Sequence, residues 1–247
     1  MDDSLMGLVF LLGLAVVSMV IYAGTGYHKD ADAEMRGSTF LGGLGGFFVH
    51  WFMWVIRPAD WLFLFLRLTP DFFNFAGLLA GAASGVFIAR GQLELGGWAI
   101  ALGGIADIFD GRIARARNLS SEYGKFIDST FDRYVEVFAF LGFAYYLRDF
   151  TYGPLAACAG ISGSLLVSYT RARGESVGVL CKEGFMQRAE RLVLTCLACL
   201  ADPGLTEAMG WRSGRVVLWV VTLIAIGTFV TAVHRTVWIS SRLRAKP

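Results

Sequence analysis

The stretch D-I-F-D-G-R-I-A-R-A-R-N-L-S-S-E-Y-G-K-F-I-D-S-T-F-D, from Asp107 to Asp132, joins the ends of two apolar runs. Asp107 and Asp110 are three residues apart, and Asp128 and Asp132 are four apart, so in helices each pair lies on one face. The short connection between the two runs predicts antiparallel neighbouring helices. The stretch therefore predicts a helical hairpin on which four carboxylates converge.

The composition around this stretch is that of a membrane protein. Of 247 residues, 55% are hydrophobic and only 17% are charged, whereas a soluble globular chain carries about a quarter charged residues. This composition excludes a disordered chain and argues against binding of nucleic acid. The net charge of +2 indicates no partner, but the charges are grouped between long apolar runs. We therefore expect an all-α integral membrane protein that lies in a lipid bilayer.

The apolar runs divide the chain into an N-terminal anchor with a polar linker, at about 1–37, and a membrane domain at 38–247. A membrane-crossing helix needs roughly 20 apolar residues, and the run at 5–23 has that length without a charge, so we expect one extra, retained transmembrane helix. The run at 47–68 is rich in tryptophan and is broken by charges and a proline, which is typical of an interfacial helix. Six core transmembrane spans are predicted near 71–90, 95–116, 125–147, 153–169, 185–200 and 214–239.

Lysine and arginine are distributed unequally between the two sides of the predicted membrane domain. The side opposite the aspartates holds only Arg90, Arg148, Arg212 and Arg215, while the other connections are rich in basic residues. Cytoplasmic loops carry an excess of lysine and arginine. We therefore expect the N-terminus outside and the four aspartates on the cytoplasmic side of the cell (inner) membrane.

Four carboxylates that converge near a membrane repel one another unless positive charge lies between them. One alternative is a salt-bridged helix end, but neighbouring arginines do not explain why all four acids face one point. Hard divalent cations with oxygen ligands do explain it, most naturally two Mg²⁺ or Mn²⁺ ions placed to clamp a diphosphate. Gly111 and Gly124 have no side chain to keep phosphates away from the backbone.

The pattern D-x-x-D-G-x-x-A-R-x8-G-x-x-x-D-x-x-x-D resembles the signature of the CDP-alcohol phosphotransferases. Its residues here are Asp107, Asp110, Gly111, Ala114, Arg115, Gly124, Asp128 and Asp132. The six core spans, the interfacial helix and the Leu68-Thr69-Pro70 sequence with Asn74 also look like this family, so the likeness covers roughly 47–244. The run at 5–23 is an addition to the family's usual plan.

This resemblance implies transfer of a substituted phosphate from a CDP-linked lipid to an alcohol, with release of CMP and with two metal ions bound. It implies that Asp107, Asp110 and Asp128 hold the metals and that Asp132 both contacts a metal and acts as general base for the acceptor hydroxyl. It further implies a homodimer. The residues implied to line the nucleotide site are Asp110, Gly111, Ala114, Arg115, Gly124, Thr69 and Asn74.

Several arginines are expected on the same cytoplasmic face as the aspartates, and guanidinium groups bind phosphate in a forked geometry. They therefore favour a phosphorylated acceptor, although some of them have the alternative role of anchoring the chain at anionic headgroups. The candidate acceptor-binding residues are Arg133, Arg171, Arg173, Arg188 and Arg191.

Two pieces of sequence near these arginines, S-Y-T-R-A-R-G-E from Ser168 and R-A-E-R-L from Arg188, look like the prokaryotic phosphatidylinositol-phosphate synthase branch. Arg171 and Gly174 stand where that branch often has lysine and alanine. The likeness implies CDP-diacylglycerol as donor and inositol phosphate as acceptor, with glycerol 3-phosphate as the nearest alternative.

Three other kinds of protein remain as alternatives. A Mg²⁺-dependent membrane prenyltransferase is expected to show two separated aspartate clusters and more spans. A transporter usually places its site near the bilayer midplane between repeated halves, and the sequence shows no internal repeat. A non-catalytic subunit that retains the fold is disfavoured, because all four aspartates are present.

Overall fold

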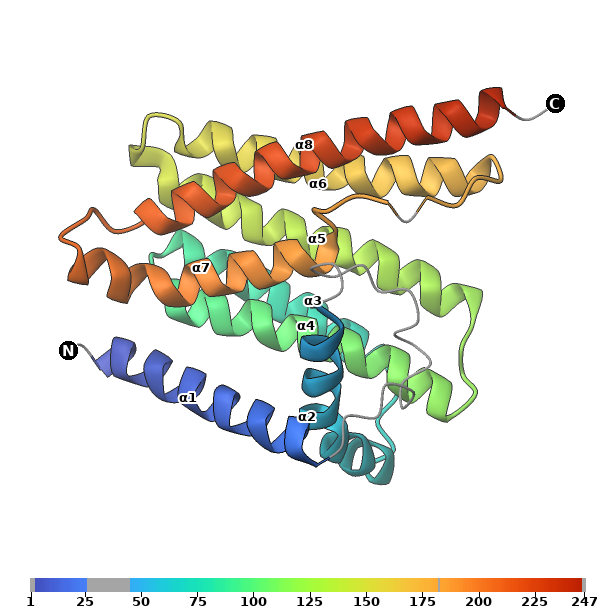
Figure 1. Cartoon of the computed structure of the whole chain (residues 1–247), viewed down its shortest axis with the longest axis horizontal. Helices are drawn as coiled ribbons and strands as arrows, with labels where there is room; N and C mark the ends of the chain where they lie inside the picture. The colour runs from blue at the N-terminus through green and yellow to red at the C-terminus, as the bar shows by residue number, and fades with distance from the viewer. Residues whose placement is uncertain (1–2, 26–44, 182, 246–247) are drawn as a thin grey trace.

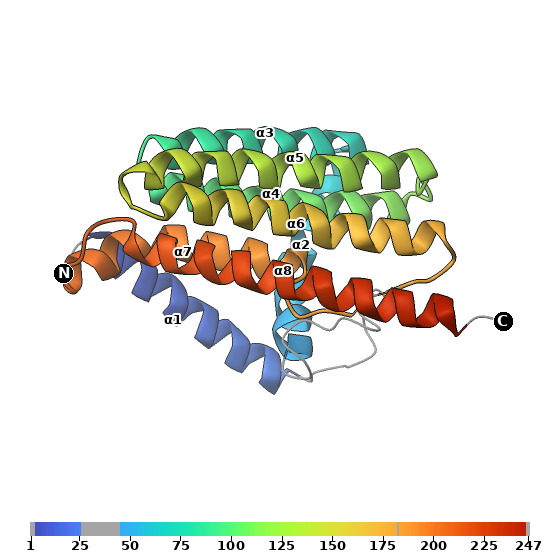
Figure 2. The same cartoon turned by 90° about the horizontal axis from the view of Figure 1, so that it is seen from above.

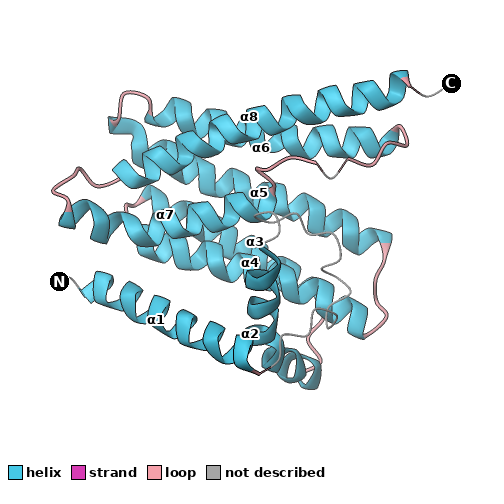
Figure 3. Cartoon of the chain, viewed as in Figure 1, coloured by secondary structure: helices cyan, strands magenta, loops and turns pink. Residues whose placement is uncertain are grey.

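The computed structural model describes residues 3–25, 45–181 and 183–245, and these residues form helices and loops without a strand (Figure 3). The predicted all-α fold is therefore confirmed. Residues 26–37 of the predicted polar linker lie outside the described residues. The helices are α1 (Asp3–Gly24), α2 (Gly45–Phe65), α3 (Pro70–Ala89), α4 (Leu93–Ala116), α5 (Glu122–Tyr146), α6 (Gly153–Ser176), α7 (Arg188–Ala208) and α8 (Arg215–Arg244), with a short 3-10 turn at Leu147–Asp149.

Helices α3 to α8 run roughly along one direction and form a bundle, whereas α2 runs across it (Figures 1 and 2). Within the bundle α3 packs on α4 and α5, α5 on α6, α6 on α8, and α7 on both α4 and α8. Helix α1 diverges from the bundle at an angle and contacts only its neighbours α7 and α2 to any extent (Figure 2). The N-terminal helix is therefore an appendage to a packed bundle of the later helices.

Small residues let α3 and α5 approach closely. A Cβ atom on Gly142 would lie 2.5 Å from the carbonyl oxygen of Gly85, so neither position has room for a larger side chain. The core of the bundle is filled by large apolar side chains from α3, α4, α5, α8 and the 3-10 turn. Its fully buried members include Ile88, Phe143, Leu147, Val221 and Ile224.

The connection between α7 and α8 is organised around the fully buried side chain of Asp202. Its carboxylate accepts hydrogen bonds from the backbone N–H groups of Gly214 at 2.8 Å, Val216 at 2.9 Å and Val217 at 3.1 Å. Gly214 has a φ of 91°, a left-handed conformation that glycine adopts without steric penalty. A carboxylate from α7 thus satisfies the first N–H groups of α8.

Helix α2 is fastened to the same end of α4 that carries the aspartate motif. Arg112 forms a bidentate ion pair with Asp60 of α2, and both side chains are largely buried. Arg117 donates to the carbonyl oxygens of Leu68 at 2.9 Å and Leu64 at 3.1 Å. These contacts hold the predicted interfacial helix against the start of the motif.

Two helices of the described chain are long and apolar enough to cross a membrane, namely Pro70–Ala89 and Arg215–Arg244. Large apolar side chains also project outward from the bundle, as shown by the exposed Leu79, Leu155, Ile226 and Val233. An exposed apolar surface of this kind is typical of contact with lipid or a partner.

Some helices are longer than their predicted spans. Helix α6 continues from 169 to Ser176, where Arg171 and Glu175 form an i,i+4 ion pair on its polar end. Helix α7 begins at Arg188 instead of 185 and continues past Pro203 to Ala208. Apolar runs give no signal for such polar ends, so the helices continue beyond the predicted ends at 169 and 200.

Candidate active site

The aspartate motif occupies the facing ends of α4 and α5. Asp107 and Asp110 lie on α4, and Asp128 and Asp132 lie on α5. One carboxylate oxygen from each of Asp107, Asp110 and Asp128 lies within 4.8 Å of the others. Asp132 joins Asp107 and Asp110 around a small cavity of about 20 Å³, a volume that suits one water molecule or ion. The structure therefore brings together the four acids that the sequence grouped.

Arg188, the first residue of α7, lies between two of these acids. Its Nη1 atom is 3.0 Å and 2.9 Å from the two carboxylate oxygens of Asp107, and its Nη2 atom pairs with Oδ1 of Asp132. Arg133 is a weaker partner, with Nη1 at 3.4 Å from Oδ2 of Asp132 and 2.5 Å from the carbonyl oxygen of Ser129. Arg188 thus connects α7 to both helices of the motif.

The residues present fit a divalent cation. Arg188 and Arg133 pair with Asp107 and Asp132, and a cation would balance the charge that four ionised carboxylates bring to the cluster. Asp110 is 6% exposed, and its Oδ2 atom has no hydrogen-bond partner in the part of the chain that the structure describes. A buried carboxylate oxygen without a partner is rare and unfavourable. Clustered carboxylate oxygens are also the ligands that Mg²⁺ and Mn²⁺ prefer.

For Arg112 and Arg117, the contacts in the structure do not support the alternative of a salt-bridged helix end. Arg112 and Arg117 turn towards α2, where they bind Asp60 and backbone carbonyl oxygens. The guanidinium group of Arg115 lies over Gly111, where a Cβ atom would be 3.1 Å from Nη1. Arg188, which comes from a different helix, binds two of the motif aspartates.

The predicted nucleotide-binding residues lie around the ends of α3, α4 and α5. Asn74 is buried, lines the small cavity with Asp107 and Asp110, and donates to the carbonyl oxygen of Pro70 at 3.3 Å. Thr69 caps α3 by accepting from the N–H of Phe72 at 3.3 Å.

Ala114 and Gly124 of the motif lie close to the connection between α4 and α5. Gly124 lies in the first turn of α5, and its N–H donates to Oγ of Ser121 at 3.1 Å. Ala114 is half-buried on α4, one turn beyond Asp110. Their roles in nucleotide binding stay predictions.

The five predicted acceptor-binding arginines separate into two groups. Arg188 and Arg133 contact the aspartates, as described above. Arg171 pairs with Glu175 at 3.0 Å and Arg173 donates to Oγ of Ser176 at 3.3 Å, both at the exposed end of α6. Arg191 is 3% exposed and binds Glu136 at 2.8 and 2.5 Å, as well as the carbonyl oxygen of Met186. The contacts of these last three arginines thus go to residues other than the aspartates.

Two residues of this region were missed by the sequence reasoning. Glu136 lies one turn beyond Asp132 and continues its i,i+4 series, which was the available signal. Arg235 is buried on α8 and donates to the carbonyl oxygens of Glu183 at 2.7 Å and Val167 at 2.9 Å. An arginine inside a predicted span is costly and usually functional, so its position in the 214–239 run could have drawn attention.

A sequence profile described as CDP-alcohol phosphatidyltransferase matches residues 67–226 of the chain. The chain belongs to the CDP-alcohol phosphatidyltransferase family. The predicted resemblance is therefore confirmed, and the chain is a phosphatidyltransferase of phospholipid biosynthesis. Family membership is incompatible with the prenyltransferase and transporter alternatives. It also makes this a member of a membrane enzyme family.

Curated relatives cover most of this phosphatidyltransferase chain. It is 31% identical to the archaetidylinositol phosphate synthase of Methanothermobacter thermautotrophicus, over 72% of this chain and 87% of the relative. It is 33% identical to the phosphatidylinositol phosphate synthase of Streptomyces avermitilis, over 74% of this chain and 77% of the relative.

The fold of this phosphatidyltransferase is also similar to solved structures of the phosphatidylinositol phosphate synthase of Mycobacterium tuberculosis. The structure in complex with manganese and citrate has a TM-score of 0.63 and 25% identity, covering 74% of this chain and 87% of that one. The structure with CDP-DAG bound has a TM-score of 0.64 and 24% identity, covering 74% and 92%. The manganese in the first structure and the aspartate cluster here agree on a site for a divalent metal.

Proposed function

We propose that this phosphatidyltransferase transfers the phosphatidyl group of CDP-diacylglycerol to inositol phosphate and releases CMP. The observation that carries the proposal is the cluster of four motif aspartates with an arginine, Arg188, bound directly beside the cavity. A phosphorylated acceptor needs a cationic group next to the reacting centre, whereas a neutral alcohol such as serine does not. The named relatives that synthesise inositol phosphate lipids support the same acceptor.

The metal ions of this proposal are two Mg²⁺ or Mn²⁺ ions held by Asp107, Asp110, Asp128 and Asp132. Bound ions of this kind neutralise charge that develops on the diphosphate as it is cleaved. The orphaned Oδ2 atom of Asp110 is the strongest support from the chain itself, because this buried oxygen has no described partner. Asp107 and Asp132 would exchange part of their contact with Arg188 for the ion.

In the reaction that we propose, the acceptor hydroxyl oxygen forms a bond to the phosphorus that carries the diacylglycerol, and the bond from that phosphorus to CMP breaks. Asp132 accepts the proton of the attacking hydroxyl, since its carboxylate lies at the cavity and on the helix that faces α4. Asp110, Gly111, Ala114, Arg115 and Gly124, with Thr69 and Asn74, surround the cytidine diphosphate.

Arg188 and Arg133 bind the phosphate of the acceptor in this proposal, because both contact the aspartates. Arg171 and Arg173 lie at the end of α6 and would attract the anionic acceptor from solution. Arg191 acts through its buried pair with Glu136, which fixes the first turn of α7 and therefore the position of Arg188. Glycerol 3-phosphate, which also carries one phosphate, is the alternative acceptor.

The proposed topology has six core spans, α3 to α8, with α2 in the interface and α1 as an additional span. The N-terminus then lies outside, and the active site faces the cytoplasm at the inner membrane. The excess of basic residues at the aspartate end supports this orientation. A homodimer is proposed from the family resemblance.

The decisive experiment measures CMP release from CDP-diacylglycerol by the purified full chain in detergent micelles with Mg²⁺. Inositol phosphate, glycerol 3-phosphate, inositol and serine are compared as acceptors, and Asp132→Asn serves as the inactive control. Release that depends on inositol phosphate and is lost in the variant supports the proposal. Release with glycerol 3-phosphate alone keeps the reaction and overturns the acceptor, while release with serine overturns the role of the arginines.

A further inference from the structure

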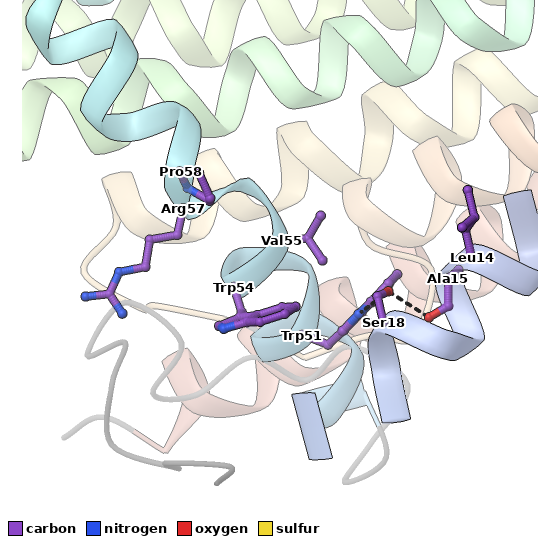
Figure 4. Close-up of a pocket in the computed structure, with 8 residues that line it drawn as sticks. All are labelled: Leu14, Ala15, Ser18, Trp51, Trp54, Val55, Arg57 and Pro58. Atoms are coloured by element: carbon purple, nitrogen blue, oxygen red, sulfur yellow. Dashed lines mark hydrogen bonds between the residues drawn. The ribbon is translucent and has the colours of Figure 1, made fainter. Parts of the chain in front are cut away.

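A second cavity lies far from the aspartate motif in sequence, between the appended helix α1 and the interfacial helix α2 (Figure 4). It is an open groove of about 740 Å³, within the range of roughly 300–1,000 Å³ that is usual for small-molecule sites. Its lining consists of Leu14, Ala15 and Ser18 from α1 and Trp51, Trp54, Val55, Arg57 and Pro58 from α2. None of these residues lines the cavity at the aspartates.

The two helices are joined at one side of this groove. The indole N–H of Trp51 donates to Oγ of Ser18 at 3.0 Å, and that hydroxyl donates to the carbonyl oxygen of Ala15 at 2.8 Å. The ring of Tyr22 packs against that of Trp54, with 5.6 Å between ring centroids. The polar groups of Ser18 and Trp51 therefore satisfy each other, and the rest of the wall is mostly apolar.

Arg57 is the exception in this wall. It is exposed, and no hydrogen bond or ion pair joins its guanidinium group to the described residues. Asp60 lies one turn further along α2 but is already bound by Arg112, so it does not balance the charge of Arg57. The groove thus combines apolar walls with one positive charge that no described residue pairs with.

This combination matches one kind of occupant. Acyl chains fit an apolar groove that opens towards the bilayer, and a guanidinium group binds phosphate in a forked geometry. Tryptophan side chains such as Trp51 and Trp54 lie typically at headgroup depth, which places a neighbouring arginine level with lipid phosphates. A membrane-spanning helix of another protein would fill the apolar wall but would leave Arg57 unpaired.

We propose that the groove between α1 and α2 binds one anionic glycerophospholipid, with an acyl chain against Leu14, Ala15 and Val55 and the phosphate on Arg57. The site is separate from the catalytic centre and does not depend on which acceptor the enzyme uses. A lipid in the groove contacts α2. The pair of Asp60 and Arg112 in turn joins α2 to α4, which carries part of the aspartate motif.

The test uses the full chain in nanodiscs of phosphatidylcholine that contain a small fraction of phosphatidylglycerol. Native mass spectrometry counts the phosphatidylglycerol molecules that stay bound when the protein is released. We expect Arg57→Gln to lower this retention about five-fold, the factor that one arginine contributes at an anionic surface. Ala15→Phe, which fills the groove, is expected to abolish the same retained molecule.

Two matched controls make the outcome specific. Arg244→Gln removes an exposed arginine at the end of α8, and Val16→Phe enlarges the exposed neighbour of Ala15 outside the groove lining. Both controls are expected to retain the lipid as the wild type does. Equal losses in Arg57→Gln and Arg244→Gln, equal retention of phosphatidylcholine, or unchanged retention in Ala15→Phe would overturn the proposal. Capture of a second polypeptide at the groove would overturn it as well.

Discussion

Nη1 of Arg188 lies 2.9 Å from Oδ2 of Asp107, across the contact between α7 and α4. The same guanidinium group reaches Asp132 on α5, so one residue from outside the motif binds both of its helices. An arginine in this position neutralises acids and also presents donors to an incoming anion. We therefore expect substitutions of Arg188 to have the largest effect on use of the acceptor.

Replacing Arg188 by glutamine or lysine is expected to weaken use of the phosphorylated acceptor. A charge-assisted hydrogen bond contributes about 1.5–3 kcal/mol, so kcat/KM for inositol phosphate should fall by roughly ten- to a hundred-fold. Lysine keeps the positive charge but cannot donate the two parallel hydrogen bonds of a guanidinium group. The fall in kcat/KM should therefore be smaller in Arg188→Lys than in Arg188→Gln, but still present. Steady-state kinetics with both substrates varied check this. An unchanged KM for the acceptor in Arg188→Gln would contradict the assignment.

Asp132→Asn is expected to reduce turnover by roughly 10²- to 10⁴-fold, the usual contribution of a general base. The amide keeps the size of the side chain but cannot take the proton of the acceptor hydroxyl. The matched control is Asp149→Asn, an exposed aspartate in the 3-10 turn that follows α5. Rates of CMP release at saturating substrates measure the effect, and equal rates for the two variants would rule out the proposed role.

Divalent metal is expected to stabilise the folded protein through the aspartate cluster. An ion present at about 100 times its dissociation constant adds about 2.7 kcal/mol of stability when it binds only the folded state. Mg²⁺ or Mn²⁺ should therefore raise the melting temperature in detergent, and chelation should abolish both this rise and CMP release. Asp110→Asn should lose the rise, whereas Asp149→Asn should keep it. The same rise in both variants would place the ion elsewhere.

The pair of Asp60 and Arg112 is expected to hold α2 on α4. Asp60→Asn and Arg112→Gln each break a largely buried ion pair and should lower stability by about 1.5–3 kcal/mol. The exchanged double variant, Asp60→Arg with Arg112→Asp, should recover part of this loss, since the coupling of contacting residues is non-additive. Thermal unfolding of the wild type, the single variants Asp60→Arg and Arg112→Asp and the exchanged double variant gives the coupling energy. Strictly additive losses would mean that the pair does not fasten the helix.

Asp202→Asn is expected to destabilise the protein by about 1–3 kcal/mol without changing the chemistry of the active site. The amide nitrogen cannot accept the N–H groups that the carboxylate accepts from Gly214, Val216 and Val217, so at least one buried donor loses its partner. A lower melting temperature with an unchanged KM for the acceptor is the expected pair of results. An altered KM at unchanged stability would contradict this structural role.

The helices and the aspartate cluster could be predicted from local patterns. Runs of apolar residues mark the helices because each must bury or expose apolar surface along its length, and spacings of three and four residues put Asp107 with Asp110 and Asp128 with Asp132 on one face. These inferences need no knowledge of which helices pack together. They therefore agree with the structure for the aspartate hairpin and for the apolar part of each helix, and differ from it at the ends of α6 and α7.

The partners of the arginines could not be predicted in this way. Arg188 and Arg191 are separated by less than one turn of α7, yet Arg188 binds Asp107 and Asp132 while Arg191 binds Glu136. Which carboxylate each one meets depends on how α7 packs against α4 and α5. Sequence spacing along α7 carries no information about that packing. The polar ends of α6 and α7 were missed for a related reason, because their residues follow no apolar period.

Arg235 of α8 binds both α6 and the loop before α7 through their backbone atoms. Its two described hydrogen-bond acceptors are the carbonyl oxygens of Val167 in α6 and Glu183 in the loop. Such a hydrogen bond does not depend on which side chain the accepting residue carries. The exposed position 183 is thus free to change during evolution or engineering, provided that the backbone keeps its course, whereas Val167 is constrained by its own burial. Arg235 has no such freedom, because a shorter or uncharged side chain cannot reach both oxygens.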